Sequence, residues 1–181
     1  MGDTLSMALE PTDTAGLRFE ALYRSCAEDV FAYVAALLRD RAAAEDVTAL
    51  AFERAFRKQR SYNARRGSER GWLFGIARNA ALDELRRRRR VAGLVTDPED
   101  PAWAGAAADD DAAEEAAARR ATVRAALAGL DPRDRELIAL KFHAGLSNAE
   151  IATVLGVSPS NAGTRLHRAV TRLREACHAT S

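Results

Sequence analysis

Residues 131–175 read DPRDRELIALKFHAGLSNAEIATVLGVSPSNAGTRLHRAVTRLRE, and the clearest structural signals of the chain lie here. The stretch opens with Asp131-Pro132, which is typical of a helix start. Aspartate caps the free backbone amides of the first turn, and proline fits that turn because it has no amide to satisfy. We therefore expect a helix that runs to about Phe142 and ends near Gly145.

Two further helices follow in the same stretch. Ser147 and Glu150 have the spacing of a capping box, in which the two residues satisfy each other's free backbone amides. The helix that they open ends at Gly156, and Ser158-Pro159 then opens a last helix. A helix, a tight glycine turn and a second helix at this spacing predict a helix-turn-helix.

The second helix of such a motif lies in the DNA major groove, with its N-terminal residues at the base edges. Asparagine and arginine bind adenine and guanine edges there through paired hydrogen bonds. The residues predicted to read duplex DNA are Ser160, Asn161, Thr164, Arg165, His167 and Arg168. The alternative is a helical hairpin whose basic face is only solvated.

The rest of the chain also indicates helices. Apolar residues recur at three- and four-residue steps over residues 17–38, the period of one helix face. Further helices are expected at about 43–60 and 72–90, with a polar loop at 61–71. Sustained period-two alternation and Asn-Gly or Asp-Gly hairpin turns are absent from the sequence, so the expected fold class is all-α. The expected inward residues of the third helix are Trp72, Ile76, Ala77 and Ala80.

The formal net charge of +1 over 181 residues conceals an uneven distribution. Residues 18–90 carry 17 basic and 10 acidic side chains, residues 119–181 carry 10 and five, and residues 91–118 carry eight acidic and no basic ones. Two small basic helical modules on a flexible acidic linker are therefore expected. The expected divisions are a disordered tail (1–16), an N-terminal module (17–90), the linker (91–118), a C-terminal module (119–176) and a C-terminal tail (177–181). The acidic linker could also fold back on the basic modules and inhibit them.

Residues 54–90 are a second candidate nucleic-acid surface. They contain 13 basic side chains, and aromatic residues are interleaved at Phe56, Tyr62, Trp72 and Phe74. Basic charge combined with stacking surfaces is how proteins hold single-stranded nucleic acid. The alternative is that Trp72 and Phe74 belong to the core and that the arginine run is a solvated helix end.

Several classes of protein are excluded. No stretch approaches the ~18 consecutive apolar residues of a membrane-spanning helix, and the N-terminus lacks the regions of a signal peptide. Cys26 and Cys177 cannot form a disulfide framework, and metal-binding spacings such as CxxC and HExxH are absent. The three histidines are dispersed, and no nucleophile–base arrangement occurs. We therefore expect a cytoplasmic protein that is not an enzyme, with no catalytic residue, cofactor, metal site, membrane insertion or small-molecule substrate.

Two parts of the sequence resemble the extracytoplasmic-function (ECF) sigma factors of bacterial RNA polymerase. AEDVTALAFERAF (44–56) and GWLFGIARNAALDELRRRRR (71–90) resemble their region 2, and residues 127–174 resemble their region 4. The ordered pair, separated by an acidic linker, is highly specific. The resemblance implies promoter-specific initiation of transcription, with core RNA polymerase, promoter DNA and an anti-sigma factor as partners.

The resemblance also implies roles for single residues. In the family, the second helix of region 2 docks on the clamp of the largest polymerase subunit; the corresponding residues are Asp46, Thr48, Ala49 and Glu53, with Ala49 where the family commonly has glutamine. Region 2 also opens the −10 element and captures an extruded base, which needs a pocket and a stacking surface. The corresponding residues are Tyr62, Asn63, Arg65, Arg66, Arg70, Trp72, Arg78 and Asn79. In the family, region 4 reads the −35 element, and the corresponding residues are the six predicted above to read duplex DNA. Gly163 stands at a position where the family frequently has a basic residue.

Two other functions compete with this interpretation. A helix-turn-helix repressor or activator with a helical effector domain would dimerise and bind duplex DNA without polymerase. An anti-sigma-like adaptor would not bind DNA at all. Transcription assays with core polymerase, with and without the chain, distinguish the three.

Overall fold

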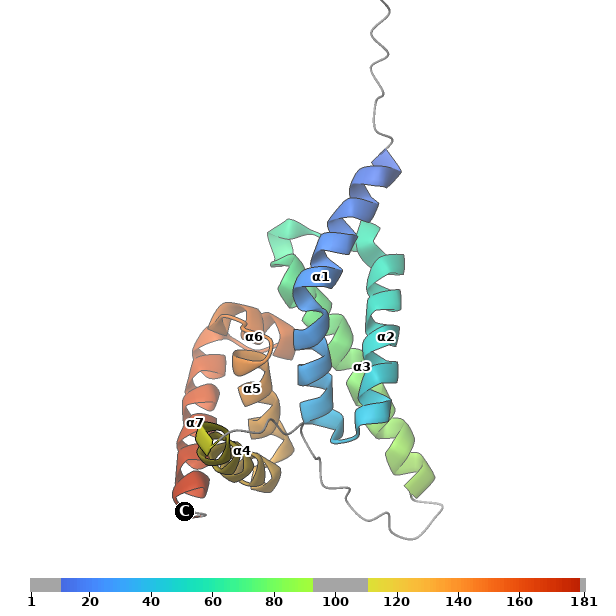
Figure 1. Cartoon of the computed structure of the whole chain (residues 1–181). Helices are drawn as coiled ribbons and strands as arrows, with labels where there is room; N and C mark the ends of the chain where they lie inside the picture. Colours follow the sequence, from blue (N-terminus) through green and yellow to red (C-terminus); the bar gives the residue numbers. More distant parts are fainter. Residues whose placement is uncertain (1–10, 93–110, 180–181) are drawn as a thin grey trace, which may run out of the picture.

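The computed structural model describes residues 11–92 and 111–179, and every regular element in these ranges is helical (Figure 1). The helices are α1 (Pro11–Leu38), α2 (Arg41–Lys58), α3 (Glu69–Ala92), α4 (Asp111–Gly129), α5 (Pro132–Phe142), α6 (Asn148–Leu155) and α7 (Pro159–Ala179). Two short 3-10 turns, Gln59–Ser61 and Ala64–Arg66, connect α2 to α3. The all-α class expected from the sequence is confirmed.

Helices α1, α2 and α3 form the N-terminal module, in which each helix contacts the other two. Val30, Val34 and Phe74 are fully buried at its centre. Full burial of apolar side chains of this size stabilises the fold by about 1.5–3 kcal/mol each. Alanines fill much of the remaining core and let the helices approach closely; they are Ala44, Ala51, Ala55, Ala77, Ala80 and Ala81.

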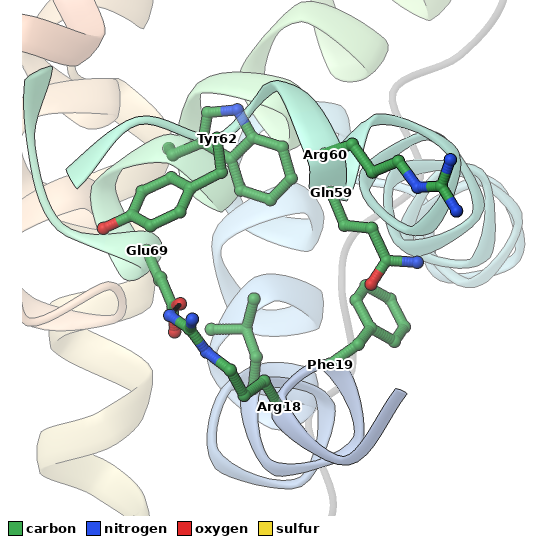
Figure 2. A pocket seen from close by; sticks show the side chains of 8 residues that line it. Arg18, Phe19, Gln59, Arg60, Tyr62 and Glu69 are labelled. Carbon is green, nitrogen blue, oxygen red and sulfur yellow. Dashed lines mark hydrogen bonds and ion pairs between the residues drawn. The ribbon is translucent and has the colours of Figure 1, made fainter. Parts of the chain in front are cut away.

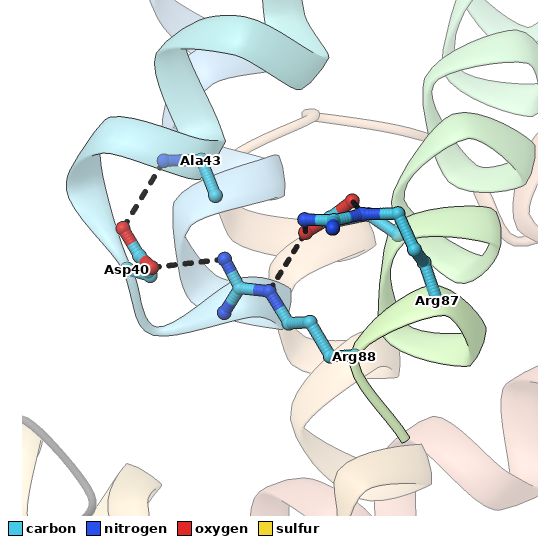
Figure 3. A network of polar contacts seen from close by, with 5 residues as sticks. Asp40, Ala43, Arg87 and Arg88 are labelled. Carbon is cyan, nitrogen blue, oxygen red and sulfur yellow. Dashed lines mark hydrogen bonds and ion pairs between the residues drawn. The ribbon is translucent and has the colours of Figure 1, made fainter. Parts of the chain in front are cut away.

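A polar network joins the start of α2 to the end of α3 (Figure 3). Asp40 caps α2 by accepting a hydrogen bond from the amide of Ala43 at 3.1 Å, and Arg88 donates to its other carboxylate oxygen at 2.9 Å. Arg87 and Arg88 both donate to Glu84, at 2.7–2.9 Å. These bonds, that of Arg87 first, lower the pKa of Glu84 to about 2 although burial opposes the shift. Part of the arginine run is therefore engaged in holding the bundle together.

Helices α4 to α7 form the C-terminal module, and its predicted caps are confirmed. Asp131 accepts a hydrogen bond from the amide of Arg133 at 2.8 Å at the start of α5. Both bonds of the capping box between Ser147 and Glu150 are present at the start of α6. Gly156 ends α6 with φ +67° and ψ +36°, a left-handed conformation that favours glycine. The turn between α6 and α7 is therefore built as the sequence predicts.

The two modules pack directly against each other. Helix α5 lies against α1, and α6 lies against α3 (Figure 1). The buried apolar side chains of both modules belong to one continuous cluster, in which Tyr33 of α1 and Leu140 of α5 are both fully buried. No helix in the described part of the chain is long and apolar enough to cross a lipid bilayer.

Helix α1 begins at Pro11 rather than at residue 17, because proline is accommodated in the first turn of a helix. Helix α4 begins at Asp111, in the second half of the expected linker, where the acidic residues from about Asp109 onward favour a helix N-terminus. The rest of the expected linker, residues 93–110, and the expected tail before Pro11 lie outside the described residues.

The buried face of α3 also differs from the expected one. Leu73 and Phe74 are fully buried, whereas Trp72 and Ile76 are only half-buried. Trp72 and Ile76 pack against the edge of the core, and Ala77 and Ala80 are buried as expected, so the inward face is shifted toward Leu73 and Phe74. The run WLFGI places apolar side chains nearly all round the first turns of the helix, so their period does not show which side faces inward.

Candidate nucleic-acid interface

Helix α7 has one apolar face and one polar face. Ala162, Leu166 and Ala169 are buried, at the four- and three-residue steps of one helix face. The six residues predicted to read duplex DNA are all exposed: Ser160, Asn161, Thr164, Arg165, His167 and Arg168. Figure 1 shows α7 along the outer side of the C-terminal module, away from the N-terminal module. The part of the polar face that these six residues form is therefore exposed.

The arginines of this face are held differently. Arg172 forms an ion pair with Asp134 of α5. Arg165 and Arg168 form no ion pair with any residue in the described ranges, so their side chains can turn toward a ligand without breaking one. At Gly163 a Cβ atom would lie 3.4 Å from Nδ2 of Asn148, at the end of a flexible side chain. This is an ordinary van der Waals contact, so the packing of α6 on α7 does not require glycine at that position.

A groove of about 650 Å³ lies between the loop and early turns of α3 on one side and α6 on the other. We call it the inter-module groove. Its N-terminal wall includes five residues predicted to bind the −10 element: Tyr62, Asn63, Arg66, Trp72 and Asn79. Its opposite wall is formed by Ala149, Glu150, Thr153 and Val154 of α6. No local signal in the sequence indicates that wall, because it comes from the other module.

Tyr62 and Trp72 line both this groove and a smaller pocket of about 190 Å³. Figure 2 shows the smaller pocket, with Tyr62 on one side of it. The ring centroids of Tyr62 and Trp72 are 5.6 Å apart, and the ring planes are tilted by 56°. The hydroxyl of Tyr62 donates a hydrogen bond to the carbonyl of Gly67 at 3.0 Å, which orients the ring. Both residues are half-buried, so part of each ring surface is open to a stacking partner.

The loop before α3 turns two arginines outward. The side chain of Asn63 accepts a hydrogen bond from the amide of Arg65 at 2.9 Å and so caps the short 3-10 turn. Arg65 and Arg66 are both exposed. Gly67 follows with φ +148°, where a side chain would be strained. The loop therefore presents positive charge beside the aromatic pair.

Arg70 and Arg78 do not line the groove, so the eight residues assigned to the −10 element do not form one surface. Nε of Arg70 donates to the carbonyl of Ala144 at 2.6 Å, and Nε of Arg78 donates to Oε1 of Glu136 at 2.6 Å. Both partners belong to the C-terminal module. These two arginines are in direct contact with the C-terminal module, whereas the five residues listed above line the inter-module groove.

The exposed face of α2 carries three of the four residues predicted to bind polymerase. Asp46, Ala49 and Glu53 are exposed at three- and four-residue steps, so they form one stripe. Thr48 is the exception, because its hydroxyl oxygen is buried and has no hydrogen-bond partner within the described residues. It lies one helical turn after the buried Ala44, so the prediction of an exposed threonine was wrong.

Comparisons with known proteins agree on both modules. The family model of sigma-70 region 2 matches residues 22–91, and that of sigma-70 region 4 matches residues 120–173. The chain is 34% identical over 156 residues to the ECF RNA polymerase sigma factor SigL of Mycobacterium tuberculosis, an alignment that covers 85% of each chain. It is 36% identical over 168 residues to the RNA polymerase sigma factor CarQ of Myxococcus xanthus, covering 90% of this chain and 91% of the other.

Two solved structures resemble the whole arrangement. One is the sigma factor RpoE in complex with the anti-sigma factor NepR from Bartonella quintana, with a TM-score of 0.71, 25% identity, and coverage of 88% of this chain and 96% of that chain. The other is CnrH in complex with the cytosolic domain of CnrY, with a TM-score of 0.65, 25% identity, and coverage of 94% and 96%.

Proposed function

This chain belongs to the ECF family of RNA polymerase sigma factors, and from that premise we propose which residues carry each step of promoter recognition. As a sigma factor it binds core RNA polymerase and promoter DNA and acts in transcription initiation. The observation that supports the assignment of residues is a pair of distinct faces. One is the open polar face of α7, and the other is the aromatic wall of the inter-module groove.

The C-terminal module, residues 119–176, reads the −35 element as duplex DNA. Helix α7 enters the major groove, where Asn161, Arg165 and Arg168 reach base edges. Ser160, Thr164 and His167 lie on the same exposed face and complete the contact surface. Because Arg165 and Arg168 have no ion pair to give up among the described residues, their binding energy is not reduced by breaking one.

The N-terminal module, residues 17–90, holds the −10 element as a single strand. Extruding a base costs a few kcal/mol, which stacking and a pocket must offset. Tyr62 and Trp72 supply the stacking surface, and Asn63, Arg66 and Asn79 line the same groove. Arg65 adds positive charge at the edge of the loop.

The exposed stripe of α2, at Asp46, Ala49 and Glu53, docks on the clamp of the largest polymerase subunit. Because two weak DNA-binding modules on one chain act bivalently, polymerase that fixes their spacing raises the affinity for a complete promoter. The protein acts in the cytoplasm without catalytic activity of its own. The related structure of RpoE contains the anti-sigma factor NepR, and that of CnrH contains the cytosolic domain of CnrY, so we assign this chain an anti-sigma factor as a further partner.

Run-off transcription with core polymerase tests the proposal. Arg165→Ala and Arg168→Ala should each weaken binding to a −35 duplex by about 5- to 150-fold, the range for losing a bidentate base contact of 1–3 kcal/mol. Binding to core polymerase should be unchanged. Arg24→Ala removes an exposed arginine of α1 outside both faces and serves as the matched control. Unchanged promoter-specific transcription by the α7 variants would contradict the assignment, and DNA binding with no dependence of transcription on the chain would favour a repressor or activator.

A further inference from the structure

The contacts between the modules involve Arg70 and Arg78, two arginines that the family resemblance assigns to the −10 element and that lie beside the inter-module groove rather than in it. Glu136 of α5 accepts hydrogen bonds from Arg78, at 2.6 Å to Nε, and from the hydroxyl of Tyr33, at 3.4 Å. Its side chain is 12% exposed and that of Arg78 is 23% exposed, so water screens the pair only weakly. The guanidinium of Arg78 is therefore neutralised by a carboxylate from the other module.

Arg70 is held in the same way. It donates to the carbonyl of Ala144 in the turn between α5 and α6, and it also forms an ion pair with Asp29 and lies over the ring of Phe74. A guanidinium with these partners cannot at the same time donate to a phosphate in the same geometry. Both arginines of this side of α3 are thus occupied while the modules are packed together.

Helix α6 contributes a second carboxylate of the C-terminal module, and this one lines the inter-module groove. Glu150 lines the groove and accepts a hydrogen bond from the hydroxyl of Ser68, which is the main reason that its pKa lies below the usual range. The carboxylate is therefore ionised at neutral pH. A negative charge in the wall opposite Trp72 and Asn79 repels the phosphates of a strand that enters the groove.

The outer face of α7 is unaffected by this packing, since its duplex-reading residues are exposed while α5 and α6 contact the N-terminal module. We propose that the C-terminal module is an intramolecular competitor of the −10 strand, with Glu136 on Arg78 where a phosphate would bind. The packed chain binds the −35 duplex but not the −10 strand, and the modules must separate before the promoter opens. This inference rests on the roles assigned to the two modules above.

An engineered disulfide between α3 and α6 can hold the two modules together reversibly and so test the proposal. A Cβ atom at Gly71 of α3 would lie 3.7 Å from Cβ of Glu150 in α6, within the range that a disulfide requires. We expect the full chain with Gly71→Cys and Glu150→Cys to form this disulfide on oxidation, in a background with Cys177→Ser. The oxidised and reduced forms of the one variant are each other's matched control, because they have the same sequence.

Two probes report the two modules: a fluorescent −35 duplex and a fluorescent single strand from the −10 region, both from a promoter that the chain transcribes with core polymerase. Oxidation should weaken binding of the single strand at least tenfold and abolish promoter opening, leave binding of the −35 duplex unchanged, and be reversed by a reductant. Equal single-strand binding by both forms, loss of −35 binding on oxidation, or failure of the disulfide to form would each overturn the proposal.

A second variant tests the competitor itself. Glu136→Gln keeps the shape of the side chain but removes the charge that holds Arg78, so the state in which the modules are packed together should be less populated. The affinity of the free chain for the single strand should then rise by about tenfold, if the fraction of chains with separated modules rises tenfold. Glu175→Gln neutralises an exposed carboxylate of α7 and should have no effect. No gain with Glu136→Gln would overturn the role of Glu136. If the chain supports no promoter-dependent transcription at all, the proposed assignment of the modules fails instead, which keeps the two failures distinct.

Discussion

Replacing Gly156 with alanine tests the turn on which the DNA-reading helix depends. Gly156 has φ +67°, in the left-handed region that costs a residue with a side chain about 1–2 kcal/mol. No heavy atom lies within 4 Å of the position where the new Cβ would be, so no clash adds to this cost. Alanine also restricts the unfolded chain, which returns about 0.4–1 kcal/mol. The net loss of stability is therefore expected to be about 1 kcal/mol.

Amide hydrogen exchange followed by mass spectrometry can localise this loss. Neither tryptophan of the chain, Trp72 or Trp103, lies in the C-terminal module, so intrinsic fluorescence does not report on it. Peptides from α6 and the start of α7 should exchange about fivefold faster in Gly156→Ala, the factor that corresponds to about 1 kcal/mol. Gly156→Asn should recover much of the protection, since asparagine tolerates the left-handed conformation better than alanine.

Gly129→Ala is the matched control with the opposite sign. Gly129 is the last residue of α4, its φ is not positive, and a Cβ atom there also has no neighbour within 4 Å. Alanine should therefore stabilise α4 by about 0.5 kcal/mol through helix propensity. Wild-type protection of α6 in Gly156→Ala, or equal effects of the two substitutions on their own helices, would refute the argument from backbone conformation.

Three further results are expected. The lowered pKa of Glu84 stabilises the fold above pH 4.5, and this stabilisation is lost as the pH falls toward 2. In urea titrations, Glu84→Gln should therefore reduce the difference in unfolding free energy between pH 6 and pH 3 by about 1 kcal/mol, and an unchanged difference would contradict the role of the network around Glu84. Leu146→Ala should cost about 3 kcal/mol in thermal unfolding, because Leu146 is fully buried, whereas the exposed Val123→Ala should cost less than about 0.5 kcal/mol. Trp72→Ala and Asn79→Ala should reduce permanganate reactivity of the −10 bubble more than closed-complex formation, and equal losses in both would count against a role in opening.

The caps of the C-terminal module could be predicted because they depend on neighbours in the sequence. Asp131, Ser147 and Gly156 act on backbone groups within a few residues, so their effect does not depend on the rest of the fold. The exposed face of α7 could be predicted for a similar reason, since the period of its apolar residues shows which side is buried.

The predictions that differ from the structure concern residues whose surroundings come from elsewhere in the chain. Thr48 looks like a small surface residue until α2 is packed in the bundle, where its hydroxyl is buried. In α3 the apolar run offers several possible inward faces, and packing on α1 and α2 selects Leu73 and Phe74 over Trp72. Local patterns carry too little information to distinguish these cases.

By itself, the sequence determined the all-α class, the helix-turn-helix with its caps, the order of the two basic modules and the family of the protein. It could not determine the partners of Arg70 and Arg78, because Ala144 is 74 residues from the first and Glu136 is 58 residues from the second. Contacts at that separation follow from how the modules pack, and the pattern of each helix alone is compatible with a solvated arginine, a DNA contact or an ion pair. Packing brings those arginines to the C-terminal module, and the competition between that module and DNA rests on this contact.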